Sequence, residues 1–281
     1  TSPAAQLFLE RASSIKPDFV LTDKNLTAIA QICKQLDGIP LALELAVPRL
    51  RSLSVDELAK KLAERFKIVT GGSRSALPHQ QTLRALVDWS YEPLPDTEKT
   101  LFASLSVFVG GWTLDAAETV CVGGVVEQWE ILDLLTHLIE KSLVIAEEQK
   151  DGTTRYRMLE TLREYSHEKF VQFGAEAICE QHLQWILAFA EEQATRLRTP
   201  ERPLALLCLE QEHDNCRAAL EWCLESTKHV EEKVRLGVAL VYYWTVRGYL
   251  IEGVAWSERI LGAIEGADPL AVAKLKTSFK I

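Results

Sequence analysis

The chain has 281 residues, of which 47% are hydrophobic and 25% charged, and its formal net charge is −9 at pH 7. This length allows two or three domains with buried cores, and the ordinary composition excludes a disordered chain. The negative charge argues against a polyanion as partner, because sequence-independent affinity for nucleic acid depends on Lys and Arg that neutralise phosphates.

The cysteines favour a reducing compartment. None of the six belongs to a Cys-x-x-Cys pair, and Cys216 and Cys223 are spaced to share one face of a helix, so we expect buried thiols in a cytoplasmic protein. The longest uncharged apolar run, Leu236–Val246, is too short to span a bilayer, and no membrane contact is expected. Because the chain starts at Thr1 and soon enters an amphipathic pattern, we also expect it to be part of a longer protein.

Residues 1–70 are predicted to form a helical subdomain. Apolar spacing indicates helices over 4–14, 22–37, 40–47 and 54–65. Gly38 is the stop signal of the second helix, and Pro40 suits the first turn of the third. Pro48 should kink or end that helix near Val47, because proline cannot donate a backbone hydrogen bond. Ser54 and Glu57 form a capping box that begins the fourth.

Residues 71–174 are predicted to form a winged helix. The stretch 70–81 is the most linker-like in the chain, and helices are expected over 82–91, 96–107, 114–121, 126–141 and 160–173. Between the helices expected over 126–141 and 160–173, the β-prone runs SLVIAEE and TTRYRML flank the turn 149–152 and predict a small β-hairpin wing.

The spacing of apolar residues predicts helices throughout residues 175–281. Expected helices cover 176–198, 204–226, 230–248, 252–265 and 269–280, and paired helices with short loops predict an α-α solenoid. The spacing of aromatic, Gly and Ala residues in YYWTVRGYL and GVAWSERIL is typical of a tetratricopeptide-like unit, of which the chain holds a truncated array.

The sequence offers no catalytic or metal-binding motif. It lacks a phosphate-binding loop, a dinucleotide fingerprint, His-Glu-x-x-His and Gly-x-Ser-x-Gly, so independent ATP hydrolysis is not expected. The run Glu212-His213-Asp214-Asn215-Cys216 is interpreted as structural, because neighbouring helical side chains diverge by about 100°. The scattered histidines are expected at surfaces or interfaces, namely His79, His137, His167, His182 and His229.

A winged helix raises DNA binding as an alternative function. The expected recognition helix, 126–141, carries four acidic residues (Glu127, Glu130, Asp133 and Glu140) and Lys141. A duplex backbone would repel such a helix, so we expect no direct nucleic-acid contact by this segment.

Several motifs resemble one family of signalling proteins. The run LDGIPLALELA, residues 36–46, resembles the GLPL motif of STAND signal-transduction ATPases, the superfamily that contains NB-ARC proteins. In family order it is followed by GGSRSALPHQQTLRALVDWSYEPL, LFASLSVFVGGWTLDAAETVC, LLTHLIEKSLV, RYRMLETLREYS and EHDNCRAALEW. Together these look like the AfsR-like and LuxR-type bacterial transcriptional regulators, over nearly the whole chain.

The resemblance implies a nucleotide switch. The chain would begin just after the nucleotide-binding core, its upstream partner, and would bind ATP or ADP only together with that core. Pro40 would contact the adenine, with Gly38 supplying the tight turn before it. An inducer or protein ligand on the helical repeats would favour an open, self-associating state, and the winged helix would act as an inter-domain clamp.

Three positions depart from the family pattern. Where many relatives carry a Met-His-Asp motif whose His reaches the ADP phosphate, this chain has Met158-Leu159-Glu160, and leucine cannot donate that hydrogen bond. His79 stands where close relatives usually have Arg, and Pro48 replaces a small helix-forming residue. Phosphate sensing by this segment is therefore in question.

The favoured interpretation is the regulatory hinge and sensor portion of a STAND-type transcriptional regulator, which is not an enzyme by itself although the whole protein would be a slow ATPase. The alternative is a nucleotide-independent scaffold that binds proteins through its repeats. A winged-helix DNA binder ranks below both. The effector domain, the inducer and the target genes do not follow from the sequence.

Overall fold

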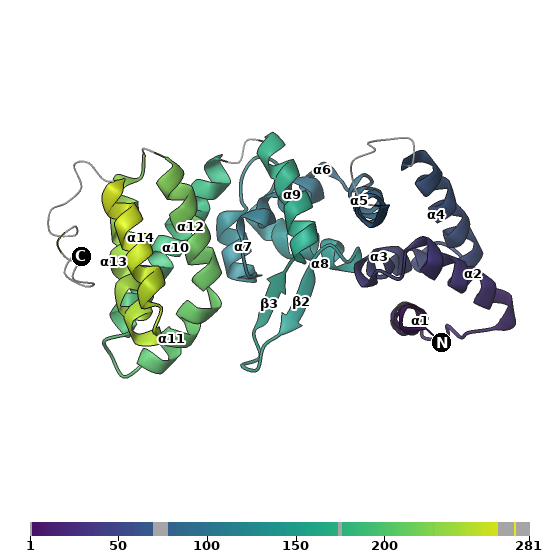
Figure 1. Cartoon of the computed structure of the whole chain (residues 1–281), viewed down its shortest axis with the longest axis horizontal. Coiled ribbons are helices and arrows are strands. Elements are labelled where there is room, and N and C mark those ends of the chain that lie inside the picture. The colour runs from purple at the N-terminus through teal and green to yellow at the C-terminus, as the bar shows by residue number, and fades with distance from the viewer. Residues whose placement is uncertain (1, 70–77, 174–175, 227, 264–272, 274–281) are drawn as a thin grey trace. The chain divides into compact units, whose positions relative to one another are not determined.

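The computed structural model describes residues 2–69, 78–173, 176–226, 228–263 and 273. Within these ranges the chain is mainly helical with one small antiparallel sheet, which confirms the predicted fold class (Figure 1). It divides into two compact units, Thr1–Lys99 with Leu132–Ile145, and Thr100–Ile131 with Ala146–Ile281. The domain boundaries predicted near residues 70 and 174 fall at residues outside the described ranges, and they stay predictions.

The first unit is a cluster of short amphipathic helices. It contains α1 (Pro3–Ile15), α2 (Asp23–Gln35), α3 (Pro40–Ala46), the 3-10 turn η1 (Val47–Arg51), α4 (Val55–Val69), α5 (Pro78–Tyr91) and most of α8 (Ile131–Glu140). Helix α2 packs against α4, and α1 packs against α3 and η1. Their apolar stripes meet in a core that includes Phe8, Ile29, Ile32, Leu36, Leu43, Leu58 and Leu62.

Local signals set the helix ends of this unit as predicted. The backbone N–H of Ser54 donates to the Glu57 carboxylate at 2.8 Å, and the N–H of Glu57 donates to Ser54 Oγ at 3.3 Å, so the capping box is present. Helix α3 gives way at Val47 to the tighter turn η1, because Pro48 has no N–H to continue the α-helical ladder.

The second unit begins with the elements around the sheet. The second unit contains the part of α6 (Asp96–Ser104) that begins at Thr100. It continues with η2 (Leu105–Val107), β1 (Trp112–Thr113), α7 (Leu114–Val120) and η3 (Gln128–Glu130). The strands β2 (Ile145–Glu148) and β3 (Thr154–Arg157) form the predicted hairpin, and α9 (Glu160–Phe173) follows. The sheet has the order β1-β3-β2, with β1 antiparallel to β3. At two residues, β1 is too short to show a strand pattern, and the sequence did not predict it.

The rest of the second unit is a helical bundle. It consists of α10 (Glu176–Arg196), α11 (Arg202–Gln211), α12 (His213–Glu225), α13 (Val230–Arg247) and α14 (Leu250–Gly262). Helix α10 packs against α12 and α13, and α13 against α14. Cys216 and Cys223 lie fully buried in this core, as predicted. None of the helices in the described ranges has the length and apolar content needed to cross a bilayer.

One helix prediction in this bundle is wrong. The single helix expected over 204–226 is two helices, because the chain turns at Glu212, whose N–H donates to the carbonyl of Cys208 at 3.1 Å. The turn starts α12 on a new axis at His213. The helix expected over 269–280 lies outside the described residues, apart from residue 273.

An aromatic cluster joins the sheet to α10. The rings of Phe108 and Trp112 stack at 5.5 Å, and His182 meets Phe108 edge-on at 5.3 Å. His182 is only 2% exposed and lies inside the second unit, so the prediction of a surface or interface position is wrong for this histidine. Burial lowers the pKa of its imidazole to about 3, because the charged form would lose its hydration.

His182 should make the protein sensitive to mild acid. Its folded-state pKa lies below the unfolded value of about 6.5, so the unfolded chain binds the extra proton and stability falls as pH drops through 6.5. Between pH 7 and pH 5 this group should cost about 2 kcal/mol of unfolding free energy. Urea unfolding of the wild type and of His182→Phe at both pH values measures the difference. His167→Gln, a control at an exposed site, should keep the pH dependence of the wild-type unfolding free energy. If that dependence is equal in all three proteins, His182 is not the group responsible for it.

Candidate functional site

The predicted nucleotide-contact residues form the junction between α2 and α3. Gly38 has a φ of +66°, a region that side chains rarely adopt, and its N–H donates to the carbonyl of Cys33 at 2.9 Å. A Cβ at Gly38 would meet the Cβ of Ala4 at an ordinary 3.6 Å, so the backbone conformation and not space requires glycine. Pro40 occupies the first turn of α3. The helix stop and the helix start are as predicted, and the adenine contact stays a prediction.

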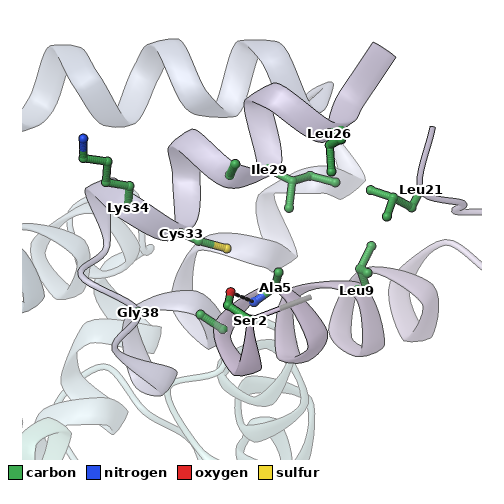
Figure 2. A pocket seen from close by; sticks show the side chains of 11 residues that line it. Ser2, Ala5, Leu9, Leu21, Leu26, Ile29, Cys33, Lys34 and Gly38 are labelled. Carbon is green, nitrogen blue, oxygen red and sulfur yellow. Dashed lines mark hydrogen bonds between the residues drawn. The ribbon is translucent and has the colours of Figure 1, made fainter. Parts of the chain in front are cut away.

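Gly38 also borders an apolar pocket between α1 and α2. The cavity has a volume of about 480 Å³ and is lined by Ser2, Ala4, Ala5, Leu9, Leu21, Leu26, Ile29, Ala30, Cys33, Lys34 and Gly38 (Figure 2). Lys34 is the single charged residue of this lining, and Pro40 does not belong to it. The pocket could therefore hold an apolar group, but it has few polar groups to orient one.

Residues at the C-terminal end of α8 pair with side chains of other elements. Glu98 of α6 is buried, and its carboxylate accepts hydrogen bonds from His137 Nδ1 at 3.0 Å and from Lys141 Nζ at 2.8 Å. Glu140 faces Arg51 at 3.4 Å. Of the four acidic residues in the segment 126–141, Glu140 is thus paired with a cation, which a count of charges along the helix does not show.

The wing contributes an exposed cation at its tip. The turn between β2 and β3 is held by the Asp151 carboxylate, which accepts the N–H of Thr153 at 3.0 Å, and by Gly152 with a φ of +81°. This turn presents Lys150 to solvent. Behind it, Arg157 pairs with Glu147 at 2.7 Å across the hairpin.

A buried polar network ties the sheet to the turn between α11 and α12. Asn215 is fully buried. Its Oδ1 accepts the N–H of Val109 at 2.7 Å, and its Nδ2 donates to the carbonyl of Gly111 at 2.9 Å. Arg155 of β3 donates to Glu212 at 2.6 Å and also to the carbonyl of Gly111 at 3.1 Å. The wing strand and the helical bundle are thus joined through fully paired polar groups.

Gly111 makes this network sterically feasible. Its φ is +97°, and an added Cβ would lie 2.5 Å from the carbonyl oxygen of Tyr156, which no side chain tolerates. The sequence interpretation treated Glu212–Cys216 as structural, and the contacts agree with that, but it did not identify Arg155 or Gly111 as partners. The pair Gly110-Gly111 before Trp112 was the available signal.

Leu159, which the resemblance at the sequence level aligns with a histidine, has an apolar side chain. Leu159 precedes α9, and its carbonyl accepts the N–H of Leu162 at 2.9 Å. Glu160 pairs with Arg163 at 2.6 Å within the helix. Within the described ranges, no group of three or more His, Cys, Asp or Glu side chains is arranged to hold a metal ion.

Comparison with known proteins identifies the segment around the wing. A family profile described as a winged helix-turn-helix domain matches residues 94–170. The chain is 41% identical over 261 residues to the "Putative HTH-type transcriptional regulator Rv0890c" of Mycobacterium tuberculosis. It is 41% identical over the same length to the "Putative HTH-type transcriptional regulator Mb0914c" of Mycobacterium bovis. Each alignment covers 93% of this chain and 29% of the relative. It is 36% identical over 175 residues to "Uncharacterized protein Rv0894" of M. tuberculosis, covering 62% of this chain and 44% of that protein.

These similarities support a regulatory role and correct one prediction. The chain spans less than a third of the length of the HTH-type relatives. The prediction that this segment makes no nucleic-acid contact is wrong, because a winged helix-turn-helix domain in a chain homologous to HTH-type regulators points to DNA binding. The charge argument failed because it counted one helix. Glu140 of that helix is paired with Arg51, Lys150 lies on another element, and acidic side chains can accept hydrogen bonds from cytosine.

The Asn215 network should be a main source of stability in the second unit. In Asn215→Ala, the N–H of Val109 and the carbonyl of Gly111 lose their buried partner, so the unfolding free energy should fall by about 2 to 4 kcal/mol. Urea unfolding followed by circular dichroism measures this. Gln184→Ala, at an exposed site on α10, should change stability by less than about 0.5 kcal/mol. A similarly small loss in Asn215→Ala would show that the network contributes little.

Proposed function

We propose that this chain is the regulatory hinge and sensor portion of an HTH-type transcriptional regulator, with a winged helix that contacts DNA and a helical bundle that receives an inducer or protein ligand. The observation that carries the proposal is the winged helix-turn-helix match at residues 94–170, inside a chain that is 41% identical to HTH-type regulators. Six free cysteines support a cytoplasmic setting.

The polar network supplies a route for regulation. A ligand that moves the start of α12 would move Glu212 and Asn215, and with them Arg155 of the wing strand and the loop at Gly111. Because breaking these buried hydrogen bonds is costly, the wing and the α11–α12 turn should move together. Ligand binding to the bundle would thereby change the position of a DNA-contacting element.

The proposal includes an ATP/ADP switch formed with a nucleotide-binding core. Its support is the resemblance at residues 36–46, together with the left-handed turn at Gly38 and the helix start at Pro40. The chain itself would not be an enzyme. The Leu159 side chain cannot donate a hydrogen bond to a phosphate, so a side-chain contact to phosphate must come from other residues.

Leu159 also favours the second candidate function. A chain without the family histidine could serve as a nucleotide-independent scaffold, with its helical bundle as the protein-binding part. Such a scaffold would share the winged helix but would show no response to ADP. Nucleotide binding therefore separates the two candidates.

The DNA-binding part predicts salt-dependent affinity for duplex DNA. Fluorescence anisotropy with a labelled mixed-sequence duplex should show binding at low ionic strength that weakens as salt rises, because phosphate contacts release counterions. Lys150→Glu at the wing tip should weaken binding severalfold and reduce the salt slope by about 1. Lys24→Glu makes the same charge change at an exposed site of α2 and is the control. Absence of binding at low salt would contradict DNA contact.

The proposed ATP/ADP switch predicts that ADP binding requires both this chain and the nucleotide-binding core. Labelled ADP should bind with micromolar or tighter affinity only to a chain extended in frame upstream through a phosphate-binding loop, and Pro40→Ala should weaken that binding about tenfold. Ala4→Ser, beside Gly38 but outside the proposed adenine contact, should leave the affinity unchanged. If the extended chain does not bind ADP, the switch is wrong and the scaffold takes its place.

A further inference from the structure

A buried histidine at the start of α12 lies between two partners that suit its two protonation states. His213 is only 5% exposed and belongs to the second unit. The indole Nε1–H of Trp244, on α13, donates to His213 Nε2 at 3.3 Å. The carboxylate of Glu252, on α14, lies 3.4 Å from the same nitrogen. One ring nitrogen therefore faces a donor and an acceptor at nearly equal distances.

His213 Nε2 can use only one of these partners in each protonation state. In a neutral imidazole the nitrogen without a proton accepts a hydrogen bond, whereas both nitrogens of the protonated ring are donors. Neutral His213 accepts from Trp244, and protonated His213 would have to donate to Glu252 instead. We propose that His213 is an acid-responsive switch, which exchanges the indole of Trp244 for the carboxylate of Glu252 when its ring takes up a proton.

Glu252 has room for this additional donor. Its carboxylate accepts from Arg217 Nε at 2.6 Å and Nη2 at 2.5 Å, and from Trp256 Nε1 at 3.2 Å. A carboxylate offers about four acceptor positions, so these three hydrogen bonds leave one for His213. The hydrogen bonds from Arg217 also lower the pKa of the Glu252 carboxyl, which keeps it ionised where a histidine titrates.

The charges around His213 set the pH range of the exchange. Burial lowers the pKa of its imidazole below the ordinary value of 6.5, and the positive charge of Arg217 acts in the same direction. Carboxylates on three elements act in the opposite direction, namely Glu252 of α14, Asp214 of α12 and Glu210 of α11. The exchange should therefore occur on the acid side of pH 6.5.

Glu210 is itself held by groups around the same ring. It accepts from the hydroxyls of Tyr243 at 3.0 Å and Tyr249 at 2.8 Å, and it pairs with Arg247 at 3.1 Å. The centres of the two tyrosine rings lie 5.1 Å and 4.9 Å from that of His213. Because these three groups engage Glu210, Glu252 is the carboxylate that the structure places at His213 Nε2.

The switch lies inside the polar network that joins the bundle to the sheet. His213 is the first residue of α12 and stands between Glu212, which is bonded to Arg155, and Asn215, which is bonded to Val109. The dipole of a helix disfavours a positive charge in its first turn, so protonation should alter the start of α12 and the environment of Val109. The switch requires neither DNA contact nor an ADP site, and it is independent of the proposed function.

Nuclear magnetic resonance of the native protein between pH 7.5 and pH 5 tests the exchange. The imidazole signals of His213 report its protonation, and the indole N–H signal of Trp244, assigned with Trp244→Phe, reports the hydrogen bond. The indole signal should move with the same midpoint as His213. His182 stays neutral over this range, because burial holds its pKa at about 3.

Two substitutions should shift this midpoint in opposite directions. Glu252→Gln removes the negative charge that stabilises the protonated ring, so the midpoint should fall to lower pH. Trp244→Phe removes the donor that stabilises the neutral ring, so the midpoint of the His213 imidazole signals should rise. If neither substitution moves the midpoint, His213 does not exchange these partners and the proposal is wrong.

Two histidine substitutions provide the controls. His213→Gln keeps an oxygen that can accept from Trp244 but does not titrate, so the indole signal should stay fixed. In His167→Gln, at an exposed site of α9, the indole signal should move as in the wild type. An indole signal that still titrates in His213→Gln would overturn the proposal. The N–H signal of Val109 should share the wild-type midpoint, and a fixed Val109 signal would overturn the extension of the switch to the sheet.

Discussion

The second unit depends on satisfying a buried amide. Asn215 is inaccessible to solvent at the start of α12, and an unpaired amide there would cost several kcal/mol, so the loop at Val109–Gly111 must lie against it. Glu212 and Arg155 extend the same network to the wing strand. Because each group is satisfied only when the others are in place, the sheet and the helical bundle form one body rather than two modules on a flexible tether.

Charge in the first unit is organised by pairing and not by composition. The buried carboxylate of Glu98 is hydrogen-bonded to His137 and Lys141, which lie one helical turn apart, and Arg51 lies opposite Glu140. These contacts neutralise acidic groups, although the Arg51 and Glu140 side chains stay about half exposed.

Local features of the sequence predicted much of the fold. The capping box at Ser54, the kink at Pro48, the turn at Gly38 and the hairpin around Gly152 each depend on residues near one another in the chain, and each is present. Features that depend on distant partners were missed. The strand β1 exists only because β3 lies beside it, α11 and α12 separate at Glu212, and His182 is buried by Phe108 from another segment.

The sequence by itself determined the mainly α class, the order of helices and wing, and the helix stop at Gly38 before Pro40, because these follow from the spacing of apolar residues and from the backbone preferences of Gly and Pro. Only the tertiary structure decided which charges are paired, which histidine is buried and how Asn215 and Arg155 meet. The physical reason is that ion pairing, desolvation and buried hydrogen bonds depend on distances between residues far apart in the chain, which no local pattern specifies.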